Sequence, residues 1–422
     1  MKLAVIGAGI VGITSAYELT LDGHEVTVFE RRQTAAEEAS FACGGLIAAG
    51  WSVPLHSPDR GLRQLLPGPH SAAALRLVGL PRASQWQWLR QCLRASTSGA
   101  HRAAAAQLHL LTRYSQQRLD ALSSSLQLTH DRAQGLLVLW RSEANQAQAH
   151  SALAWLREQD WPHQMLSRAQ AHQVEPALNA HTPLHAALWL PEATAVNCRQ
   201  FALLLKAQAQ QRGCRFEFAH TVERLSTAGG VTLTHCQAGQ DARHESRFDA
   251  VVVCAGATSA ALLRPLGLHL PLQAVYGHSI SAALREPLDA PAAAVLDAHQ
   301  QVSITRLGQR IRVAGGLQFG GAPARESAAE LRRLHQVLSD WFPGAARFGG
   351  GGVQEWQGAQ AFLPDAGLLL GQSRLPAVWF NLGHGGSGWA LACGCARALA
   401  DQMQGRVTDL DLAGFAPQRL GL

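Results

Sequence analysis

The sequence predicts an α/β protein in which a dinucleotide-binding domain carries an inserted α+β domain with a mixed or antiparallel sheet. Three observations support this prediction. A β-branched strand, a glycine-rich turn and an amphipathic helix follow one another at the N-terminus. A long, mostly helical segment separates this unit from later apolar strands. The chain ends on another strand, a glycine-rich turn and a helix of small residues. With 422 residues, the chain is long enough for two hydrophobic cores.

The first strand runs into the sequence GAGIVG, residues 7–12. Gly7 lets the chain turn sharply out of the strand, Gly9 leaves room for a pyrophosphate, and Gly12 lets the helix lie close to the sheet. The start of that helix offers free N–H groups and a positive dipole to phosphates. Glu30 ends the second strand, where a carboxylate can accept hydrogen bonds from ribose hydroxyls. The pattern is typical of a Rossmann-type site rather than of a simple glycine turn.

Local patterns predict the elements between the two ends. Small residues, glycine and proline over 34–58 predict a loop that passes the nucleotide. Apolar residues recur at helical spacing over 84–169, interrupted by an apolar strand over 135–140. A helix over 198–212 is expected to end at Gly213. Further strands are expected over 215–218, 231–234, 248–254, 276–282, 301–305, 310–314 and 377–381, and a closing helix over 389–403.

The order of these elements predicts a discontinuous nucleotide-binding domain. We expect it to comprise residues 1–83, 170–265 and 345–422. Residues 84–169 and 266–344 are expected to form the inserted domain, which covers the substrate. No internal repeat or low-complexity linker separates these parts of the sequence.

Composition limits the classes of partner. Hydrophobic residues make up 47% of the chain, which fits an ordinary globular protein, whereas charged residues make up only 16%. The net charge of +6 permits attraction to anionic surfaces. Because no run of basic residues stands out, we expect no nucleic-acid partner. The eight cysteines include no CxxC pair, so we expect reduced thiols and no metal site.

The cysteine pattern also favours a cytoplasmic protein. Since the first strand already begins at Lys2, we expect no targeting peptide. An uncharged segment over 377–396 contains Asn381, His384 and five glycines, which make it a poor membrane-spanning helix. A peripheral contact with the inner face of a membrane is left open.

Two later motifs carry chemistry. Ala255 and Gly256 follow a buried apolar strand, so their backbone can approach a ligand at the carboxyl edge of the sheet. Residues 381–389 read NLGHGGSGW and open a helix. Four glycines over 383–388 expose consecutive N–H groups, and the helix start adds its dipole. This combination suits the electron-rich edge of a reduced flavin, with a flexible glycine loop as the alternative.

Together these residues resemble the flavin-dependent D-amino acid dehydrogenases of the D-amino acid oxidase and glycine oxidase superfamily. The resemblance includes the loop EASFACGG over 38–45 and covers essentially the whole chain. It is most specific at the two ends and in LGLHLP over 266–271. It implies a two-domain flavoprotein that binds FAD without a covalent bond and oxidises a D-amino acid. It also implies that the electrons pass to a quinone or to O2.

The resemblance further implies the cofactor contacts. Val222 is expected to touch the adenine through its backbone, and the loop over 40–46 to line the pyrophosphate and the flavin. The full set of residues expected to bind FAD is Gly7, Gly9, Ile10, Val11, Gly12, Glu30, Arg31, Ser40, Cys43, Gly44, Gly45, Leu46, Val222, Ala255, Gly256, Gly383, Gly385, Gly386, Ser387, Gly388 and Trp389.

One departure from the family concerns the substrate. Members commonly carry W-x-G-x-R-P-x-x-P-D, whose arginine holds the substrate carboxylate, whereas residues 356–365 read WQGAQAFLPD with Gln360 at that position. Glutamine donates hydrogen bonds but cannot form the charged bidentate fork. Losing such a pair costs about 1.5–3 kcal/mol, so an ordinary amino acid should bind weakly unless another cation serves. Arg60, Arg306 and Arg312 are the candidates for that cation.

A second departure lies in the strand that crosses the flavin face. The family often reads KGYS there, and residues 276–279 read YGHS. Tyr276 and His278 can orient an amine or tune its proton, although Tyr276 can equally be a packed strand aromatic. His384 can contact flavin or substrate, or make a structural hydrogen bond within the glycine loop. With Gln360, these three residues form the candidate catalytic set.

The expected reaction is oxidation of a C–N bond by hydride transfer to the flavin, after which the imine hydrolyses. The flavin carries this chemistry, and the protein supplies orientation and electrostatics. Gln360 motivates two alternatives: a secondary, cyclic or carboxylate-free amine as substrate, or an FAD-binding electron-transfer protein without turnover. A nicotinamide dehydrogenase is a third alternative, because Glu30 suits NAD ribose. The glycine-rich turn over 383–388, called the C-terminal glycine element below, argues against it.

Overall fold

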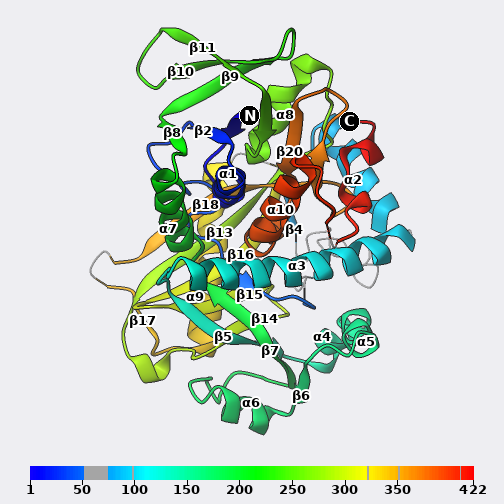
Figure 1. Ribbon diagram of the computed structural model, residues 1–422. Helices are drawn as coiled ribbons and strands as arrows, with labels where there is room; N and C mark the ends of the chain where they lie inside the picture. The colour runs from blue at the N-terminus through cyan, green and yellow to red at the C-terminus, as the bar shows by residue number, and fades with distance from the viewer. Residues whose placement is uncertain (52–74, 97–98, 321–322, 350–351, 409) are drawn as a thin grey trace.

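The computed structural model describes residues 1–51, 75–96, 99–320, 323–349, 352–408 and 410–422. Within these ranges one six-stranded sheet has the order β19–β20–β12–β1–β2–β8 (Figure 1). All its strands are parallel except β19, which pairs antiparallel with β20. Their bounds are β1 (Lys2–Ile6), β2 (Glu25–Glu30), β8 (Arg215–Phe218), β12 (Ala250–Val253), β19 (Leu369–Gln372) and β20 (Val378–Leu382).

The strand β1 lies in the middle of this sheet, and the chain continues to β2 on one side and to β12 on the other. In open α/β sheets a ligand binds outside the carboxyl ends of the strands at such a switch point. The fold therefore directs the search for a site to the end of β1.

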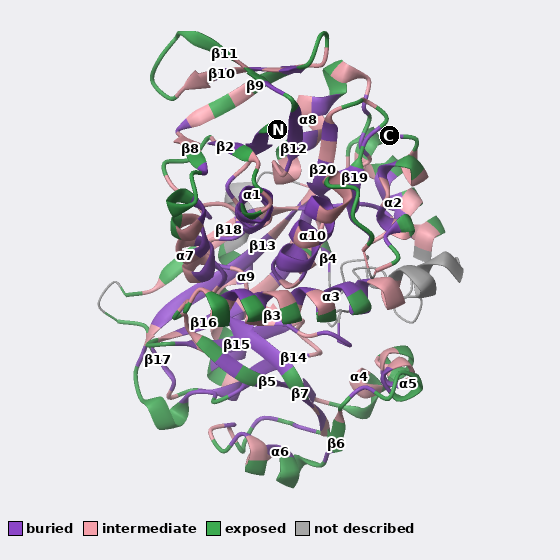
Figure 2. Cartoon of the chain, in the orientation of Figure 1, coloured by how far each residue is buried: buried purple, intermediate pink, exposed green. Residues whose placement is uncertain are grey.

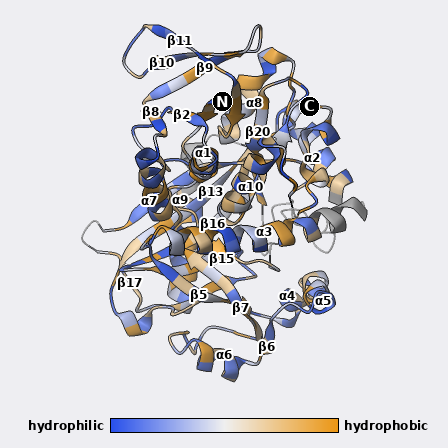
Figure 3. Ribbon diagram, viewed as in Figure 1, coloured by the Kyte–Doolittle hydropathy of each residue, from blue (hydrophilic) through white to orange (hydrophobic). Residues whose placement is uncertain are grey.

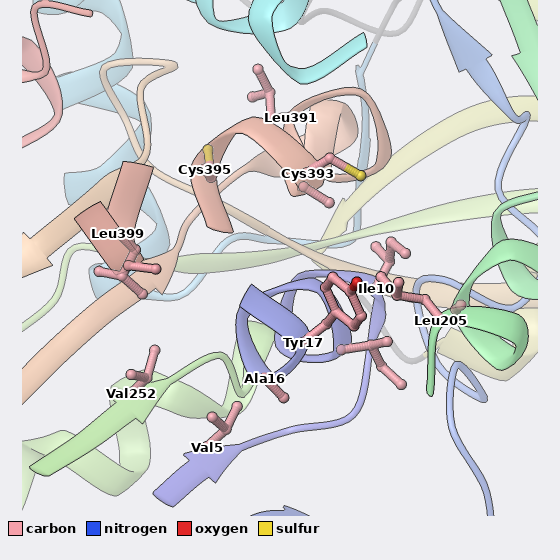
Figure 4. Close-up of a cluster of buried hydrophobic side chains, with 14 of the residues drawn as sticks. Val5, Ile10, Ala16, Tyr17, Leu205, Val252, Leu391, Cys393, Cys395 and Leu399 are labelled. Carbon is pink, nitrogen blue, oxygen red and sulfur yellow. The ribbon is translucent and has the colours of Figure 1, made fainter. Parts of the chain in front are cut away.

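Helices cover one face of this sheet: α1 (Ile10–Leu21), α7 (Cys198–Gln211) and α10 (Gly388–Met403). Figure 4 shows their side chains gathered around Tyr17, with Val5 and Val252 contributed by the sheet. In Figure 3, α7 carries both hydrophobic and hydrophilic residues. Its buried side consists of Phe201, Ala202, Leu205 and Ala209. The helix itself is the one that the sequence predicted over 198–212.

The other face packs against a small antiparallel sheet and the helix α8 (Ser259–Leu263). That small sheet consists of β9 (His220–Ser226), β10 (Val231–Gln237) and β11 (Arg243–Phe248). Because side chains alternate along a strand, Val5 faces the helices whereas its neighbours Ala4 and Ile6 face the small sheet. Both faces of β1 are therefore buried.

A second, mixed sheet of the described residues has the order β17–β13–β16–β15–β14–β5–β7–β3, with β18, β4 and β6 attached to it. Its bounds are β3 (Leu46–Ile47), β4 (Leu75–Val78), β5 (Arg132–Trp140), β6 (Gln164–Leu166), β7 (Ala186–Val196), β13 (Gln273–Leu284), β14 (Ala294–Asp297), β15 (Val302–Leu307), β16 (Arg310–Gly320), β17 (Ala346–Arg347) and β18 (Gln354–Phe362). Most neighbouring strands are antiparallel, but β14 pairs parallel with β5. Figure 2 shows its central strands as buried.

The remaining helices lie around this sheet (Figure 1). Leu334, Val337 and Trp341 of α9 pack into an apolar core with Ile280 and Val313 of the sheet. The long helix α3 lies against α10. The bounds of these remaining helices are α2 (Ala83–Ser96), α3 (Gly99–Ser125), α4 (Glu143–Ala147), α5 (His150–Glu158), α6 (Arg168–Val174) and α9 (Pro323–Trp341).

A buried ion cluster joins α1, α3 and α10. Glu18 is fully buried, and its carboxylate accepts hydrogen bonds from Arg118 at 2.7 and 2.8 Å and from Arg397 at 2.7 Å. Arg397 also donates to Asp22 at 2.5 Å. Since both arginines neutralise the same carboxylate, the cluster fixes the C-terminal helix against the N-terminal one.

The predicted fold class is confirmed: an α/β nucleotide-binding part is combined with a mixed sheet. Within the large sheet, the expected strands over 301–305 and 310–314 form the antiparallel pair β15–β16. The strands β7 and β18 also pair in this sheet, although the predicted boundaries assign both to the nucleotide-binding domain. Among the described residues no helix combines the length and the apolar character that crossing a membrane requires.

Candidate cofactor and substrate site

The glycine-rich turn after β1 has the shape that its sequence predicts. Gly7 has φ +105°, and a Cβ there would lie 2.7 Å from the carbonyl oxygen of Cys254. A Cβ on Gly12 would lie only 1.8 Å from the carbonyl oxygen of Gly7. Neither position accepts a side chain, because real Cβ atoms do not approach backbone this closely. These two glycines therefore bring the start of α1 against the ends of β1 and β12.

Two side chains hold this turn in place. The hydroxyl of Ser40 accepts a hydrogen bond from the Ile10 N–H at 3.0 Å, at the start of α1. Glu30 accepts one from the Ala8 N–H at 2.7 Å through one oxygen, and one from the Arg32 N–H at 2.8 Å through the other. A carboxylate has about four lone-pair positions, so Glu30 keeps acceptor capacity for ribose hydroxyls.

A cavity of about 600 Å³ opens at the carboxyl ends of β1, β12 and β20. The glycine turn forms one wall, and β9 contributes another with Val222. Ser40 and Cys43 reach it from the loop after β2, and Tyr276 and Gln360 from the large sheet. The cavity therefore brings the expected nucleotide residues and two expected substrate residues together.

The C-terminal glycine element lies at the end of this cavity. His384 forms an isolated antiparallel bridge with Phe362, the last residue of β18. A Cβ on Gly385 would lie 2.7 Å from the Phe362 ring, and one on Gly383 would lie 2.8 Å from Leu363. Glycine is therefore required for the turn to lie against β18, which places the start of α10 beside the cavity.

Gln360, at the position of the family arginine, is enclosed by two glycines. A Cβ on Gly277 would lie 2.8 Å from its Nε2, and one on Gly386 would lie 3.4 Å from its Oε1. Its Oε1 is buried and has no hydrogen-bond partner among the described residues. The amide therefore has an acceptor available between β13 and the glycine element.

His384 lines this cavity and also a second one. Burial lowers the pKa of its imidazole to about 4, so the ring is neutral near pH 7. Its Nε2 is buried without a hydrogen-bond partner in the described ranges. A neutral ring nitrogen is thus available where the two cavities meet.

The second cavity has a volume of about 280 Å³ and shares Gly383 to Gly386 with the first. Its wall includes Leu46, Leu317 and Phe362 and is largely apolar. The indole Nε1 of Trp51, also in the wall, is buried without a partner in the described part of the chain.

His278 lines neither of these cavities. The ring is buried, and Nδ1 donates to the carbonyl oxygen of Gly316 at 2.7 Å. Burial lowers the pKa of the ring, which is therefore neutral. The pairing of β13 with β16 is irregular here, because a step of three residues along β16 stands opposite a step of two along β13 between Tyr276 and His278. Direct contact between His278 and an amine has no support in this placement.

The candidate carboxylate-binding arginines do not line the cavities either, as far as they are described. Arg312 is buried, and it donates to the Ser281 hydroxyl at 3.0 Å and to the carbonyl oxygen of Cys43 at 3.3 Å. Arg306 donates to the carbonyl oxygens of Gly308 and Pro287, both at 3.4 Å. Arg60 lies outside the described residues.

Most of the expected FAD-binding residues line the first cavity. Five of them do not, and their roles are indirect: the carbonyl oxygen of Gly45, for example, accepts a hydrogen bond from Trp389 at 3.1 Å. These five are Gly12, Gly44, Gly45, Leu46 and Ser387, of which Leu46 and Ser387 line the second cavity.

Sequence reasoning missed several residues of the wall. They include Cys198, Thr221, Glu223, Cys254 and Asn381. Asn381 donates to the Ser15 hydroxyl at 2.9 Å, and its Oδ1 is buried without a described partner. The signal for Asn381 was its position at the carboxyl end of a buried strand, next to the glycine run.

These residues fit FAD. The turn over 7–12 packs too closely for side chains at Gly7 and Gly12, which brings the start of α1 to the cavity, and Glu30 retains acceptor sites for a ribose. Gly256 has open space where a Cβ would stand, at the carboxyl end of β12. Asn381 Oδ1 and His384 Nε2 are buried and have no hydrogen-bond partner among the described residues. They lie at the other end of the cavity, beside the C-terminal glycine element. The cavity thus offers separate surroundings for the nucleotide and for the flavin ring.

Comparisons with known proteins agree with this assignment. A family model described as FAD dependent oxidoreductase matches residues 2–402. The chain is 33% identical to the D-amino acid dehydrogenase of Allorhizobium ampelinum over 427 residues, covering 99% of this chain and 98% of that protein. It is 35% identical to the D-amino acid dehydrogenase of Cereibacter sphaeroides, covering 99% and 95% of the two chains.

Solved structures show the same fold. Glycine oxidase from Geobacillus kaustophilus superposes with a TM-score of 0.78 at 21% identity, covering 99% of this chain and 98% of that one. Iminodiacetate oxidase from a Chelativorans species superposes with a TM-score of 0.71 at 18% identity, covering 99% of both chains.

Proposed function

The chain belongs to the family of FAD-dependent oxidoreductases, and from this premise we propose that it oxidises the carbon–nitrogen bond of a D-amino acid or a related amine. FAD supplies the hydride acceptor when it is bound. The observation that carries the proposal is that Tyr276 and Gln360 line the same cavity as the nucleotide-binding turn. The full-length match to relatives named D-amino acid dehydrogenase supports the substrate class.

The residues of this cavity orient a neutral amine. Tyr276 presents a phenol that can accept from or donate to the amine nitrogen. His384 stays uncharged near pH 7, so it does not repel a developing iminium cation. N–H groups between Gly385 and Gly388 stabilise negative charge that develops at the neighbouring end of the cavity. Removing the α-hydrogen as hydride needs no strong base from these side chains.

Gln360 sets the recognition of the substrate's polar group. Its amide can donate through Nε2 and accept through the unpartnered Oε1. The amide donates an uncharged hydrogen bond to a carboxylate, whereas an arginine at this position would form a charged bidentate pair. A carboxylate-free, secondary or cyclic amine is therefore the second candidate substrate. The apolar second cavity receives the substrate's hydrocarbon side.

Anaerobic mixing of the holoenzyme with a panel of amines tests this function. We expect D-alanine or another D-amino acid to bleach the flavin absorption, and the L-enantiomer to bleach it more slowly. Bleaching by carboxylate-free or cyclic amines alone would favour the second candidate. If dithionite bleaches the flavin and every amine fails, the proposed C–N oxidation is wrong.

The electron acceptor is a quinone or O2. A quinone requires peripheral association with the inner face of a membrane, which the net charge of +6 permits when lipids are anionic. The rates of flavin reoxidation by O2 and by a soluble quinone analogue, measured on the same reduced sample, distinguish the two acceptors.

A further inference from the structure

We propose that Cys43 and Cys198 form a dithiol site in the wall of the FAD cavity, which hydrogen peroxide converts into a disulfide. Both residues line that cavity, and both are free thiols in the structure. The site is a redox modification site, and it is independent of which amine the enzyme oxidises.

The backbone brings the two cysteines together. The Val196 N–H donates to the carbonyl oxygen of Gly45 at 2.9 Å, next to the ladder in which Leu46 pairs with Ala195. Cys43 and Cys198 each lie two residues beyond that bonded pair, on adjacent ends of the two segments. The two thiols interact closely enough that each changes the pKa of the other. Opposed residues on adjacent antiparallel segments have Cα atoms about 4.5–5.5 Å apart, within the range of about 4.4–6.8 Å that a disulfide spans.

Their surroundings make one of the two thiols reactive. The neighbouring Cys198 thiol and the Arg312 guanidinium together lower the pKa of Cys43 to about 7, although burial opposes them. Burial and the neighbouring Cys43 sulfur raise the pKa of Cys198 well above its usual value, although Arg312 opposes them. Arg312 also donates to the Cys43 carbonyl oxygen at 3.3 Å, which keeps its charge next to this residue. Cys43 is therefore the attacking thiolate, and Cys198 is the resolving thiol.

Cys254 provides a contrast within the same cavity. It also lines the wall, but its sulfur lies 3.9 Å from the Ser15 hydroxyl, its one hydrogen-bond contact within the described residues. Burial raises the pKa of this thiol to about 12. Cys254 therefore stays protonated at neutral pH and should react slowly, even though peroxide that enters the cavity reaches it too.

One molecule of hydrogen peroxide oxidises the two thiols to the disulfide. The Cys43 thiolate attacks a peroxide oxygen, the O–O bond breaks, and hydroxide leaves and takes a proton to become water. The Cys198 sulfur then attacks the resulting sulfenic acid, the S–S bond forms, and a second water carries away the hydroxyl and the Cys198 proton. The two sulfurs are oxidised, and the peroxide is reduced to two waters.

Peptide mapping by mass spectrometry tests the proposal on the purified holoenzyme. The protein is treated with hydrogen peroxide, its remaining thiols are alkylated, and its digest is compared with and without dithiothreitol. We expect one linked peptide pair that contains Cys43 and Cys198, loss of two alkylated thiols per chain, and recovery of both with dithiothreitol. The variant C254S should form the same link.

The variants C43S and C198S should each lack the linked pair, and in C198S the Cys43 sulfur should accumulate as sulfenic or sulfinic acid. The proposal is overturned if peroxide leaves both cysteines alkylatable, or links either one to a different cysteine. It is also overturned if wild-type Cys43 oxidises to sulfinic acid without a link. Because the wild-type digest decides these outcomes, the proposal stays testable even if a variant does not fold.

Discussion

The indole N–H of Trp389 donates a hydrogen bond to the carbonyl oxygen of Gly45, 3.1 Å away. Trp389 lies in the first turn of the C-terminal helix, and Gly45 belongs to the loop that follows the N-terminal nucleotide unit. This contact joins the two ends of the sequence at the cofactor cavity, because Trp389 also lines its wall.

Replacing Trp389 with phenylalanine tests this contact. The carbonyl oxygen of Gly45 keeps its bond from the Val196 N–H, so we expect a loss of only about 1 kcal/mol in unfolding free energy. Affinity for FAD should fall as well, because the loop is then held less firmly. Denaturant unfolding and FAD titration measure the two effects. W86F, at a half-exposed tryptophan, should change neither.

Replacing Gly12 with alanine should abolish retention of FAD. The new Cβ would stand 1.8 Å from the Gly7 carbonyl oxygen, so the turn and the helix must separate. We expect purified G12A to lack flavin absorption and to unfold at a lower temperature. G349A is the matched control, because a Cβ there meets nothing within 4 Å. Full flavin retention by G12A would mean that the turn does not hold the pyrophosphate.

Replacing Gln360 with arginine should favour substrates that carry a carboxylate. A charged pair contributes about 1.5–3 kcal/mol against about 0.5–1.5 kcal/mol for a neutral bond, and a gain of about 1–1.5 kcal/mol corresponds to roughly fivefold to tenfold tighter binding. Without a ligand the buried charge should lower the melting temperature, and a carboxylate ligand should restore it. Q354R, at the exposed start of the same strand, should show neither effect. Unchanged KM values for D-amino acids in Q360R would place the carboxylate elsewhere.

The stability of FAD-free protein should depend on the protonation of His384. Burial lowers the pKa of His384 to about 4, whereas in the unfolded chain the imidazole takes up its proton near the ordinary value of 6.5. Between these values the unfolded state binds more protons, so the unfolding free energy must fall as the pH drops from 6.5 toward 4. Urea unfolding at several pH values measures this slope. The unfolding free energy should depend less steeply on pH in H384Q. The dependence should be unchanged in H181Q, which alters an exposed histidine.

Replacing Glu18 with alanine should destabilise the packing of α1 against α10. The carboxylate is fully buried between Arg118 and Arg397, whose side chains are 24% and 12% exposed. Because water partly reaches both arginines, we expect a loss of about 2–3 kcal/mol, at or below the lower end for a broken buried pair. E25A, which removes an exposed pair with Arg215, should cost less than about 1 kcal/mol. Equal losses in the two variants would contradict the structural role of Glu18.

The elements that the sequence predicted well are those with local signals. The fingerprint over 7–12 and the helix end at Gly213 depend on glycine geometry within a few residues. The membership of β7 and β18 in the large sheet depends instead on pairing with distant strands, which neighbouring residues do not encode. For that reason the local sequence could not indicate which sheet these strands join.

In the candidate site, too, local sequence signals identified residues, but long-range packing decided where they lie. Tyr276 and Gln360 line the cavity, whereas His278 is buried beside it and donates to the carbonyl oxygen of Gly316. The contact between Cys43 and Cys198 could not be predicted, because it requires the loop after β2 to meet the start of α7. Single-residue signals identify candidates, but only the tertiary packing decides which of them face the same space.

Titration of FAD-free protein with FAD tests the central claim most directly, because one cavity is built from both ends of the chain. We expect flavin fluorescence to change until one FAD is bound per chain, with saturation lost in G12A and retained in G349A. Protein that remains colourless after incubation with FAD would contradict the account.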